Sequence, residues 1–262
     1  NSDATTDWLI CRSEFGEAWI DARQHALVAG LEVVRGVFRE VDAELRVEVL
    51  SHDGDRVAPM ERVMTFAGSA ASILKAERTA LNFLQTLSGT ATAARQFVDA
   101  VAGTTCRILD TRKTLPGLRL AQKYATRCGG ALNHRLGLYD RILIKENHIV
   151  AAGSIAAAVA TARRTAAGLQ VEVEVESLAE FDAALASGAD IIMLDELSLD
   201  DMRAAVTRNR SAPRRAQLEA SGSVTLATLP AIAATGVDFV SIGGITKHLR
   251  AVDLSMRLDF ID

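Results

Sequence analysis

The feature that most constrains the fold is a repeat of short apolar runs and alanine-rich segments that begins near Cys106. The apolar runs cover residues 107–109, 142–144, 171–175, 191–194, 216–218 and 239–242. Alanine-rich stretches of helical character, at 154–166, 178–187 and 226–234, lie between them, and Gly188 and Gly236 stand where helices commonly end. The runs lack polar alternation, as expected of strands covered on both faces. The pattern predicts a parallel sheet of βα units, either open or closed into a barrel.

The first third of the chain has a different pattern. Residues 31–34, 45–50 and 57–66 form short β-branched runs that predict strands, and Asp53-Gly54 between the last two is typical of a hairpin turn. Residues 69–87 then change to helical periodicity, and Gly89 is predicted to end that helix. We therefore expect a separate N-terminal unit before the βα repeat.

Composition limits the class of protein. A chain of 262 residues that is 49% apolar can bury a sizeable core. Its net charge of −4 provides no overall attraction to nucleic acid or to a membrane, and we expect neither as a partner. The longest apolar stretch, 149–162, is too short to span a bilayer. The three cysteines are odd in number and lack metal-ligand spacing, which favours a reducing, cytoplasmic location.

Charged or glycine-rich residues follow each of the six predicted strands of the repeat. These strand ends carry residues 110–113, 145–146, 174 with 176, 195–196, 219 with 221–222, and 243–244. In a parallel barrel the C-terminal ends of the strands meet at one mouth, where active sites form. Polar residues end many strands for structural reasons alone, but six such ends together favour an active site.

A basic group lies between Arg112 and Lys145. Arg112 and Arg135 offer planar guanidinium groups that grip a carboxylate or phosphate with two hydrogen bonds, and Lys113 and Lys145 offer compact charges. His134 alone is typical of a packed or surface histidine, whereas its position beside Arg135 favours a functional role. The basic group predicts an enzyme that acts on a small polyanionic substrate.

An acidic group accompanies these cations. Glu174 and Asp195, with Glu219 as a further candidate, could bind Mg²⁺, accept hydrogen bonds from sugar hydroxyls or stabilise a cationic transition state. Glutamates 172, 174 and 176 alternate along one strand and share a face, which could be the interior or the exterior of a barrel. Ser221-Gly222 and Gly243-Gly244 are weak signals of a loop that binds phosphate through backbone N–H groups.

Several blocks together resemble the quinolinate phosphoribosyltransferase family from about residue 30 onward. They are Glu-Arg-Thr-Ala-Leu-Asn (77–82), Asp-Thr-Arg-Lys-Thr-Leu-Pro-Gly (110–117), Asn-His-Arg-Leu-Gly (133–137), Ile-Lys-Glu-Asn-His (144–148), Ile-Met-Leu-Asp (192–195), Leu-Glu-Ala-Ser-Gly (218–222) and Gly-Gly-Ile-Thr-Lys-His (243–248). The resemblance implies that quinolinate and phosphoribosyl pyrophosphate give nicotinate mononucleotide, pyrophosphate and CO₂, with Mg²⁺, in de novo NAD biosynthesis.

The resemblance also implies an α/β architecture in two domains. Residues 1–90 with 249–262 are expected to form an N-terminal α/β sandwich, and residues 91–248 an incomplete parallel α/β barrel. Members of the family are dimers or larger homo-oligomers, in which the neighbouring subunit completes each active site. Arg78 matches the arginine that the partner subunit supplies.

The roles of individual residues follow from the same resemblance. Arg112, His134 and Arg135 match positions that bind quinolinate, and Lys113 and Lys145 match lysines near pyrophosphate and substrate. Glu174 and Asp195 match the carboxylates at the ribose and the metal. The positions that match the loops for the 5′-phosphate are Ser221, Gly222, Gly243 and Gly244, with Lys247 at a position that is histidine in some members.

Three other readings remain open on the residues. The chain could be a related phosphoribosyltransferase acting on nicotinate, although a monocarboxylate needs fewer arginines. It could be a barrel lyase with Lys145 as a Schiff-base nucleophile, although such an enzyme does not need so many other cations. It could be a non-catalytic metabolite-binding protein, although the intact Glu174, Asp195, Lys113 and Lys145 argue against that.

Overall fold

A computed structural model describes residues 3–11, 13–166 and 168–261, which divide into two compact units. The first unit holds the described residues up to Arg95, residues 124–130 and those from His248 onward. The second unit holds residues 96–123 and 131–247. The domain limits predicted from the sequence, 1–90 with 249–262 and 91–248, differ from this division chiefly in the segment 124–130.

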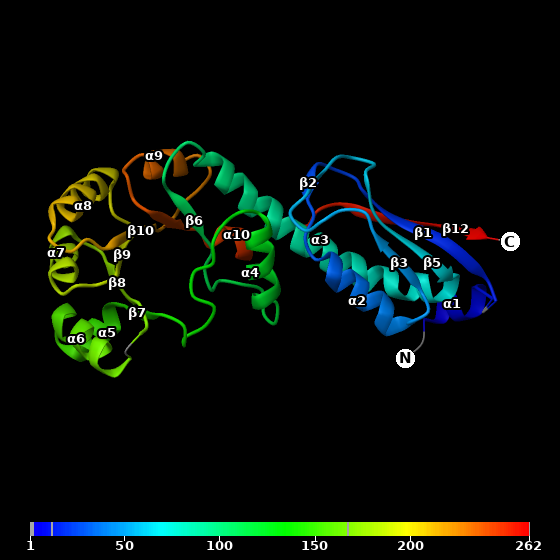
Figure 1. Ribbon diagram of the computed structural model, residues 1–262, viewed down its shortest axis with the longest axis horizontal. Helices are drawn as coiled ribbons and strands as arrows, with labels where there is room; N and C mark the ends of the chain where they lie inside the picture. Colours follow the sequence, from blue (N-terminus) through cyan, green and yellow to red (C-terminus); the bar gives the residue numbers. More distant parts are fainter. Residues whose placement is uncertain (1–2, 12, 167, 262) are drawn as a thin grey trace. The chain divides into compact units, whose positions relative to one another are not determined.

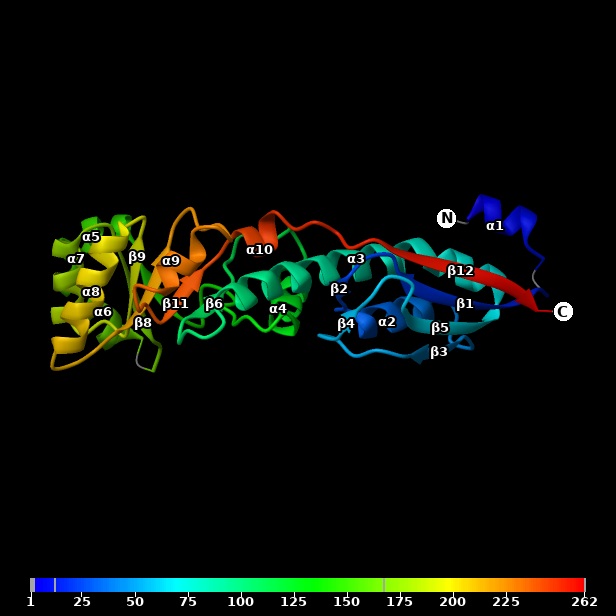
Figure 2. The same ribbon diagram turned by 90° about the horizontal axis from the view of Figure 1, so that it is seen from above.

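The first unit is built on an antiparallel sheet with the strand order β12-β1-β5-β3 (Figures 1 and 2). The strands are β1 (Phe15–Ala22), β3 (Arg46–Val49), β5 (Arg62–Ser69) and β12 (Leu254–Ile261). Burial alternates along β1, so Ala18, Ile20 and Ala22 face the core. The remaining elements are α1 (Ala4–Leu9), α2 (Leu31–Val41), α3 (Ala70–Ala100, which continues into the second unit), and the short pair β2 (Ala26–Leu27) and β4 (Arg56–Val57).

The strand predicted for residues 31–34 is wrong, because these residues begin helix α2. Leu31, Val34 and Phe38 are the buried residues of this helix, and their spacing of three and four places them on one face. The Phe38 ring stacks on Phe66 of β5, with the ring centroids 3.9 Å apart. A window of four residues was too short to reveal this helical period.

The predicted hairpin around Asp53-Gly54 is only partly confirmed. The predicted runs 45–50 and 57–66 do pair, as β3 with β5 in an antiparallel ladder. The connection between them is longer than a tight turn, because it contains β4, which pairs with β2. The Asp53 carboxylate accepts hydrogen bonds from the backbone N–H groups of Gly30 and Leu31, at 2.9 and 3.1 Å. Asp53 thereby satisfies donors at the start of α2, which Gly30 leaves without a side-chain cap.

Gly89 does not end the helix as predicted, since α3 continues through it to Ala100. A Cβ atom at this position would lie 2.4 Å from the carbonyl oxygen of Arg250. Gly89 is therefore required by the close approach of the C-terminal segment to the helix, and not by a change of backbone direction.

The second unit contains a parallel sheet of six strands in the order β6-β11-β10-β9-β8-β7. They are β6 (Arg107–Leu109), β7 (Ile142–Ile144), β8 (Val171–Val175), β9 (Ile191–Asp195), β10 (Gln217–Ser221) and β11 (Phe239–Ser241). The helices are α4 (Arg119–Cys128, whose C-terminal half belongs to the first unit), α5 (Glu146–Ala152), α6 (Ile155–Thr165), α7 (Leu178–Ala186), α8 (Leu199–Ser211), α9 (Leu229–Ala233) and α10 (Gly244–Lys247).

The α/β fold class is confirmed, with an antiparallel sheet domain and an incomplete parallel barrel. In the described residues, β6 and β7 form the two edges of the parallel sheet and do not pair with each other. Figure 1 shows α6, α7 and α8 along the outer side of this sheet. No helix in the described part of the chain is both long enough and apolar enough to cross a membrane.

Candidate active site

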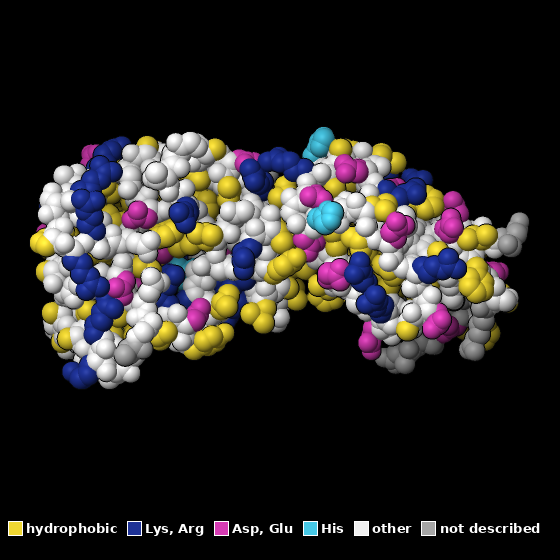
Figure 3. Space-filling view, in the orientation of Figure 1, with side chains coloured by type: hydrophobic (Ala, Val, Ile, Leu, Met, Phe, Trp, Pro, Cys, Tyr) yellow, Lys and Arg dark blue, Asp and Glu magenta, His cyan; other side chains and the backbone are white. Residues whose placement is uncertain are grey.

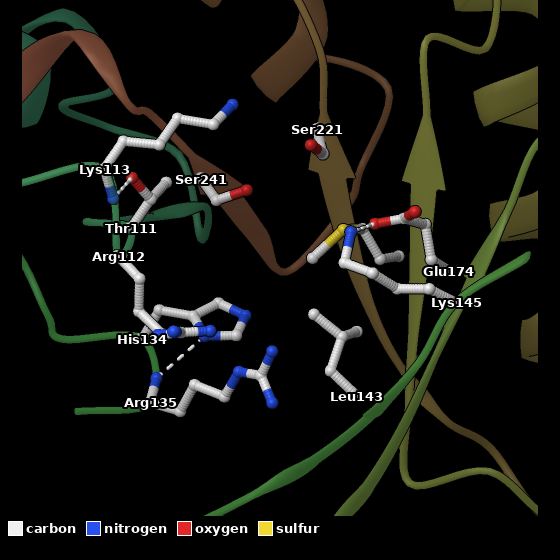
Figure 4. Close-up of a pocket in the computed structure, with 11 residues that line it drawn as sticks. Thr111, Arg112, Lys113, His134, Arg135, Leu143, Lys145, Glu174, Ser221 and Ser241 are labelled. Atoms are coloured by element: carbon white, nitrogen blue, oxygen red, sulfur yellow. Dashed lines mark hydrogen bonds and ion pairs between the residues drawn. The ribbon is translucent and has the colours of Figure 1, made fainter. Parts of the chain in front are cut away.

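A pocket in the second unit lies at the C-terminal ends of the parallel strands (Figure 4). It is lined by Thr111, Arg112, Lys113, His134, Arg135, Leu143, Lys145, Glu174, Met193, Ser221 and Ser241. The strands supply residues at or near their C-terminal ends. The basic side chains come from the connection between β6 and β7 and, in the case of Lys145, from the position directly after β7. The fold thus brings seven of the predicted site residues together: Arg112, Lys113, His134, Arg135, Lys145, Glu174 and Ser221.

The other predicted residues lie in several places. Asp195 ends β9 and is paired in register with Ser221 of the neighbouring strand β10. Gly222 lines an adjoining cavity that also includes Ser221. A Cβ atom on Gly243 would lie 3.0 Å from Cδ of Lys113, and Gly244 begins the short helix that ends at the exposed Lys247. Arg78 is an exposed residue of α3 in the first unit.

Arg112 and Arg135 form the cationic part of the pocket. Burial, together with the positive charge of Arg112, lowers the pKa of Arg135. The Nε atom of Arg112 is buried and has no hydrogen-bond partner among the described residues. A bound dianion would offset the unfavourable burial and repulsion of the Arg135 charge and would supply an acceptor for the unsatisfied donor of Arg112.

A buried ion pair fixes the backbone that carries these arginines. Asp110 ends the run of β6, and its carboxylate accepts a hydrogen bond from Lys123 Nζ at 2.6 Å; both side chains are at most 1% exposed. The Asp110 carboxylate also accepts from the backbone N–H of His134 at 2.8 Å and from the Asn133 amide at 2.7 Å. Asp110 therefore ties the segment before Arg112 to the segment that holds His134 and Arg135.

The Lys123–Asp110 pair is costly to bury, and burial is the largest influence on the pKa of each of the two groups. Burial raises the pKa of Asp110 and lowers the pKa of Lys123, and in each case the partner opposes the effect. Lys123 Nζ also donates to the backbone carbonyl of His134 at 2.9 Å. Asp110 and Lys123 were not predicted as functional residues, since a strand-terminal Asp and a helical Lys are each commonplace.

His134 is held at both ring nitrogens. Its Nδ1 accepts a hydrogen bond from the backbone N–H of Arg135 at 2.7 Å. Its Nε2 lies 3.2 Å from Oε2 of Glu172 and 3.6 Å from Oε2 of Glu219. Glu172 and Glu219 are fully buried, so the face of β8 that Glu172 and Glu174 share is the interior face of the incomplete barrel.

Glu174 and Lys145 form an ion pair at the mouth of the pocket. Glu174 is half-buried near the end of β8, and Lys145 is exposed directly after β7, as expected at the mouth of a parallel barrel. Asp195 is also half-buried, at the end of the adjacent strand β9. Carboxylate oxygens at neighbouring strand ends are the donor type that Mg²⁺ prefers, so Glu174 and Asp195 fit the ion chemically.

Glu196 approaches the glycine loop in a way the sequence did not predict. Its φ is +51°, a left-handed value that is uncommon for a residue with a side chain. A Cβ atom on Gly222 would lie 2.8 Å from the Glu196 carboxyl group, which also accepts a hydrogen bond from the Ser223 hydroxyl at 3.0 Å. The end of the Glu196 side chain could shift to make room, so glycine at position 222 is favoured chiefly by its φ of +142°, which L side chains rarely adopt.

A second basic area, over α7 and α8 on the face shown in Figure 3, differs from the pocket. Arg208 pairs with Asp182 at 2.6 Å, and Arg203 pairs with Asp200 at 2.7 Å. These are exposed ion pairs on helix surfaces, where the arginines already have carboxylate partners. The pocket at the strand ends is therefore the better candidate for binding an anionic substrate.

Comparison with known proteins gives one consistent result. Residues 3–88 match the family described as quinolinate phosphoribosyl transferase, N-terminal domain, and residues 90–257 match its C-terminal domain. A nicotinate-nucleotide pyrophosphorylase (carboxylating) of Mycobacterium leprae is 42% identical over 90% of this chain and 84% of its own length.

Solved structures agree with the sequence comparison. The nicotinate-nucleotide pyrophosphorylase of Francisella tularensis has a TM-score of 0.94 and 43% identity, covering 98% of this chain and 90% of that one. NadC of Streptococcus pyogenes has a TM-score of 0.95 and 39% identity, covering 100% of this chain and 92% of that one.

Proposed function

This chain belongs to the quinolinate phosphoribosyltransferase family, and from that premise we propose that it transfers the phosphoribosyl group of phosphoribosyl pyrophosphate to quinolinate. Loss of CO₂ then gives nicotinate mononucleotide and pyrophosphate, a step of de novo NAD biosynthesis. The observation that carries the proposal is the pairing of Arg112 with Arg135 in a pocket that also contains Lys113, Lys145 and Glu174.

The two arginines account for selection of quinolinate. Quinolinate carries two adjacent carboxylates, and each guanidinium can hold one of them with paired hydrogen bonds. The buried Nε of Arg112 would gain its missing acceptor. A ring with one carboxylate would leave one of the two close cations without a partner, which favours quinolinate over nicotinate.

Glycosyl transfer is the first chemical step. Cleavage of the bond between ribose C1 and the pyrophosphate oxygen develops positive charge on the sugar, while the quinolinate nitrogen forms the new bond to C1. Glu174 and Asp195, at the ends of β8 and β9, would stabilise that positive charge electrostatically. Lys113 and Lys145 would stabilise the negative charge of the departing pyrophosphate.

The phosphate end of the sugar would lie beside the glycine-containing strand ends. Ser221 lines both the substrate pocket and the adjoining cavity that contains Gly222, which supports a donor that spans the two. We assign the 5′-phosphate to Ser221 and Gly222 on one side and to Gly243, Gly244 and Lys247 on the other. Lys247 is exposed and lies in the same turn as these glycines.

Mg²⁺ is the metal that this donor set would hold, with Glu174 and Asp195 as its protein ligands. When bound, the ion would neutralise charge on the pyrophosphate oxygens. Lys145 pairs with Glu174 in the structure, so this lysine competes for the same carboxylate oxygens and would turn towards the phosphates when the ion binds.

Decarboxylation is expected to need little further help from the protein. Once the ring nitrogen is ribosylated it is cationic, and the electron pair left at C2 by departing CO₂ is stabilised beside it before a proton replaces the carboxylate. With preformed ribosylated intermediate, His134→Ala and Lys145→Ala variants should therefore still release CO₂. Complete loss of that release in either variant would contradict this view of the second step.

We also propose a homodimer or larger homo-oligomer in which Arg78 of a neighbouring subunit completes the pocket, and a cytoplasmic location. The exposure of Arg78 supports the first proposal. The odd number of cysteines, three, supports a reducing compartment.

Pyrophosphate release, with identification of the nucleotide by mass spectrometry, tests the function. We expect turnover with quinolinate and phosphoribosyl pyrophosphate, much weaker turnover with nicotinate, and loss of activity in EDTA that Mg²⁺ restores. Preferred turnover of nicotinate would assign the chain to the related activity. Trapping of substrate on Lys145 by borohydride would instead indicate a Schiff-base enzyme.

A further inference from the structure

A buried cluster beneath the pocket contains two glutamates with no part in the mechanism above. One side-chain ligand atom from each of His134, Glu172 and Glu219 lies within 4.8 Å of the other two. Glu172 and Glu219 do not line the pocket, whereas His134 does. Any effect of the two glutamates on the substrate must therefore pass through a neighbouring side chain.

The hydrogen bonds of the cluster define the state of His134. A backbone N–H can only donate, so Nδ1 of His134 accepts from Arg135 and carries no hydrogen. The hydrogen of the neutral ring is then on Nε2, where the nearest oxygen is Oε2 of Glu172 at 3.2 Å. Both nitrogens of His134 are occupied inside the protein, so the pocket receives the carbon edge of the ring.

The two glutamates differ in the charged groups that lie beside them. Arg141 Nη1 lies 3.3 Å from Oε2 of Glu172, which gives this carboxylate a cation in addition to the His134 donor. Neither oxygen of Glu219 makes a hydrogen bond of good geometry with a described residue, although the Ser241 hydroxyl is close enough to favour its ionised form. A second buried carboxylate without a cation is strongly unfavourable, whereas a carboxyl group that keeps its proton is neutral and can donate to Glu172.

We propose that Glu172 and Glu219 are positioning residues for the quinolinate pocket, Glu172 as a carboxylate and Glu219 as a neutral acid. Glu172 holds Arg135 by two routes. It fixes the ring of His134, whose Nδ1 accepts from the Arg135 backbone, and it fixes Arg141, whose carbonyl accepts from Arg135 Nη1 at 3.4 Å. The two glutamates thus determine the direction of Arg135, one of the two arginines proposed to bind the carboxylates of quinolinate.

The titration of Glu219 agrees with this assignment. Burial and the negative charge of Glu172 raise the pKa of Glu219 well above the usual value.

Amide substitutions distinguish the two roles, because glutamine resembles a neutral carboxyl group and not a carboxylate. Glu172→Gln should raise the KM for quinolinate roughly tenfold or more, and leave the KM for phosphoribosyl pyrophosphate within about threefold of wild type. Glu219→Leu should also raise the quinolinate KM, by about tenfold, and Glu219→Gln should restore it to within about threefold. Glu40→Gln, the same change on an exposed surface, serves as the matched control.

The test also separates the inference from the proposed function on which it rests. If wild-type protein does not turn over quinolinate, the function is wrong. If wild type is active but Glu219→Gln loses quinolinate affinity as severely as Glu172→Gln, or Glu172→Gln changes all parameters equally, the positioning roles are wrong.

Two measurements on wild type remain decisive if a variant does not fold. Nitrogen-15 NMR of the histidine rings, with His134 assigned from a His134→Gln spectrum, should show a neutral ring protonated at Nε2 at pH 7. A doubly protonated or Nδ1-protonated ring would overturn the proposal. So would metal analysis that finds one tightly held divalent cation per chain that is absent from Glu219→Gln, because a metal ion would then supply the charge assigned here to a proton.

Discussion

Arg112 and Arg135 are the residues on which substrate choice most directly depends. The lowered pKa of Arg135, caused by burial and by the charge of Arg112, means that the positive charge of Arg135 is disfavoured where it lies. The buried Nε of Arg112 adds an unsatisfied donor. An anion with two carboxylates relieves both penalties together, so binding energy is concentrated on these two side chains.

The first prediction concerns the planar guanidinium of Arg135. Arg135→Lys keeps the positive charge but loses paired hydrogen bonding, so the KM for quinolinate should rise roughly tenfold to a hundredfold while that for phosphoribosyl pyrophosphate changes little. Steady-state kinetics with each substrate varied in turn measure both constants. Arg164→Lys, on the exposed surface of α6, is the matched control. An unchanged quinolinate KM in Arg135→Lys would remove Arg135 from the binding site.

The second prediction is a pH dependence of stability at Glu219. Its pKa in the folded protein lies well above the ordinary value of 4.5, so near and above that pH the folded state binds more protons than the unfolded state. This contribution to stability is complete below pH 4.5 and is lost as the pH rises towards the folded pKa. Glu219→Gln cannot lose a proton, so it should gain stability relative to wild type as pH rises above 5.

Urea unfolding of wild type and Glu219→Gln at several pH values between about 5 and 8 measures this difference directly. The comparison cancels the titration of groups that both proteins share. Glu172 and Arg141 are both present in the variant, so the difference between the two proteins comes from the titration of residue 219 and from its interaction with these neighbours. A difference that is constant with pH would show that Glu219 is ionised throughout this range.

At the scale of elements, the sequence predicted the six parallel strands because each is a short apolar run followed by a charged or glycine-rich end. Such strands are buried on both faces, so their composition alone identifies them. The segment 31–34 could not be assigned in this way, since Leu31, Val34 and Phe38 reveal a helix only over eleven residues. Gly89 was misread because its role depends on Arg250, which is remote in sequence.

The candidate site, like the fold, was predictable only in part. Residues near or just after the C-terminal ends of strands, such as Glu174 and Lys145, could be placed at one mouth from topology alone. The roles of Glu172 and Glu219 could not, because they depend on which face of β8 and β10 is interior and on how far His134 reaches between them. Buried polar clusters arise from packing between segments, and the order of residues in one segment does not encode such contacts.

The third prediction concerns the ion pair that joins β6, α4 and the segment before β7. Lys123→Met leaves the buried Asp110 carboxylate without its cation and should lower the free energy of unfolding by about 3–5 kcal/mol. Asp110→Asn combined with Lys123→Met should be less destabilised than the single variant. Lys75→Met, which breaks a partly exposed pair with Asp7, should lose less than about 1 kcal/mol.

Denaturant unfolding of the three variants tests the claim, and the difference between them matters more than any single value. A small loss in Lys123→Met, similar to that in Lys75→Met, would mean that water or a changed side-chain position compensates Asp110. The buried pair would then not be what holds His134 and Arg135 in place.

For the whole molecule, the main question is how the two units serve one reaction. The pocket lies within the second unit, and Arg78 belongs to the first. Arg78 is exposed on α3 and is not part of the core of the first unit, although Ala76 and Ala80 beside it are. Its exposure leaves it accessible to another copy of the chain, which supports the proposal of a shared site.

The fourth prediction tests this shared site by complementation. Arg78→Ala and Arg112→Ala proteins should each be nearly inactive, because each removes one cation from every pocket. After subunit exchange, a mixed dimer would contain one pocket with both defects and one with neither, so about a quarter of wild-type activity should return in an equal mixture at random exchange. Exchange must be verified with differently tagged chains. If activity does not return after verified exchange, Arg78 must act on the pocket of its own chain or have no part in catalysis.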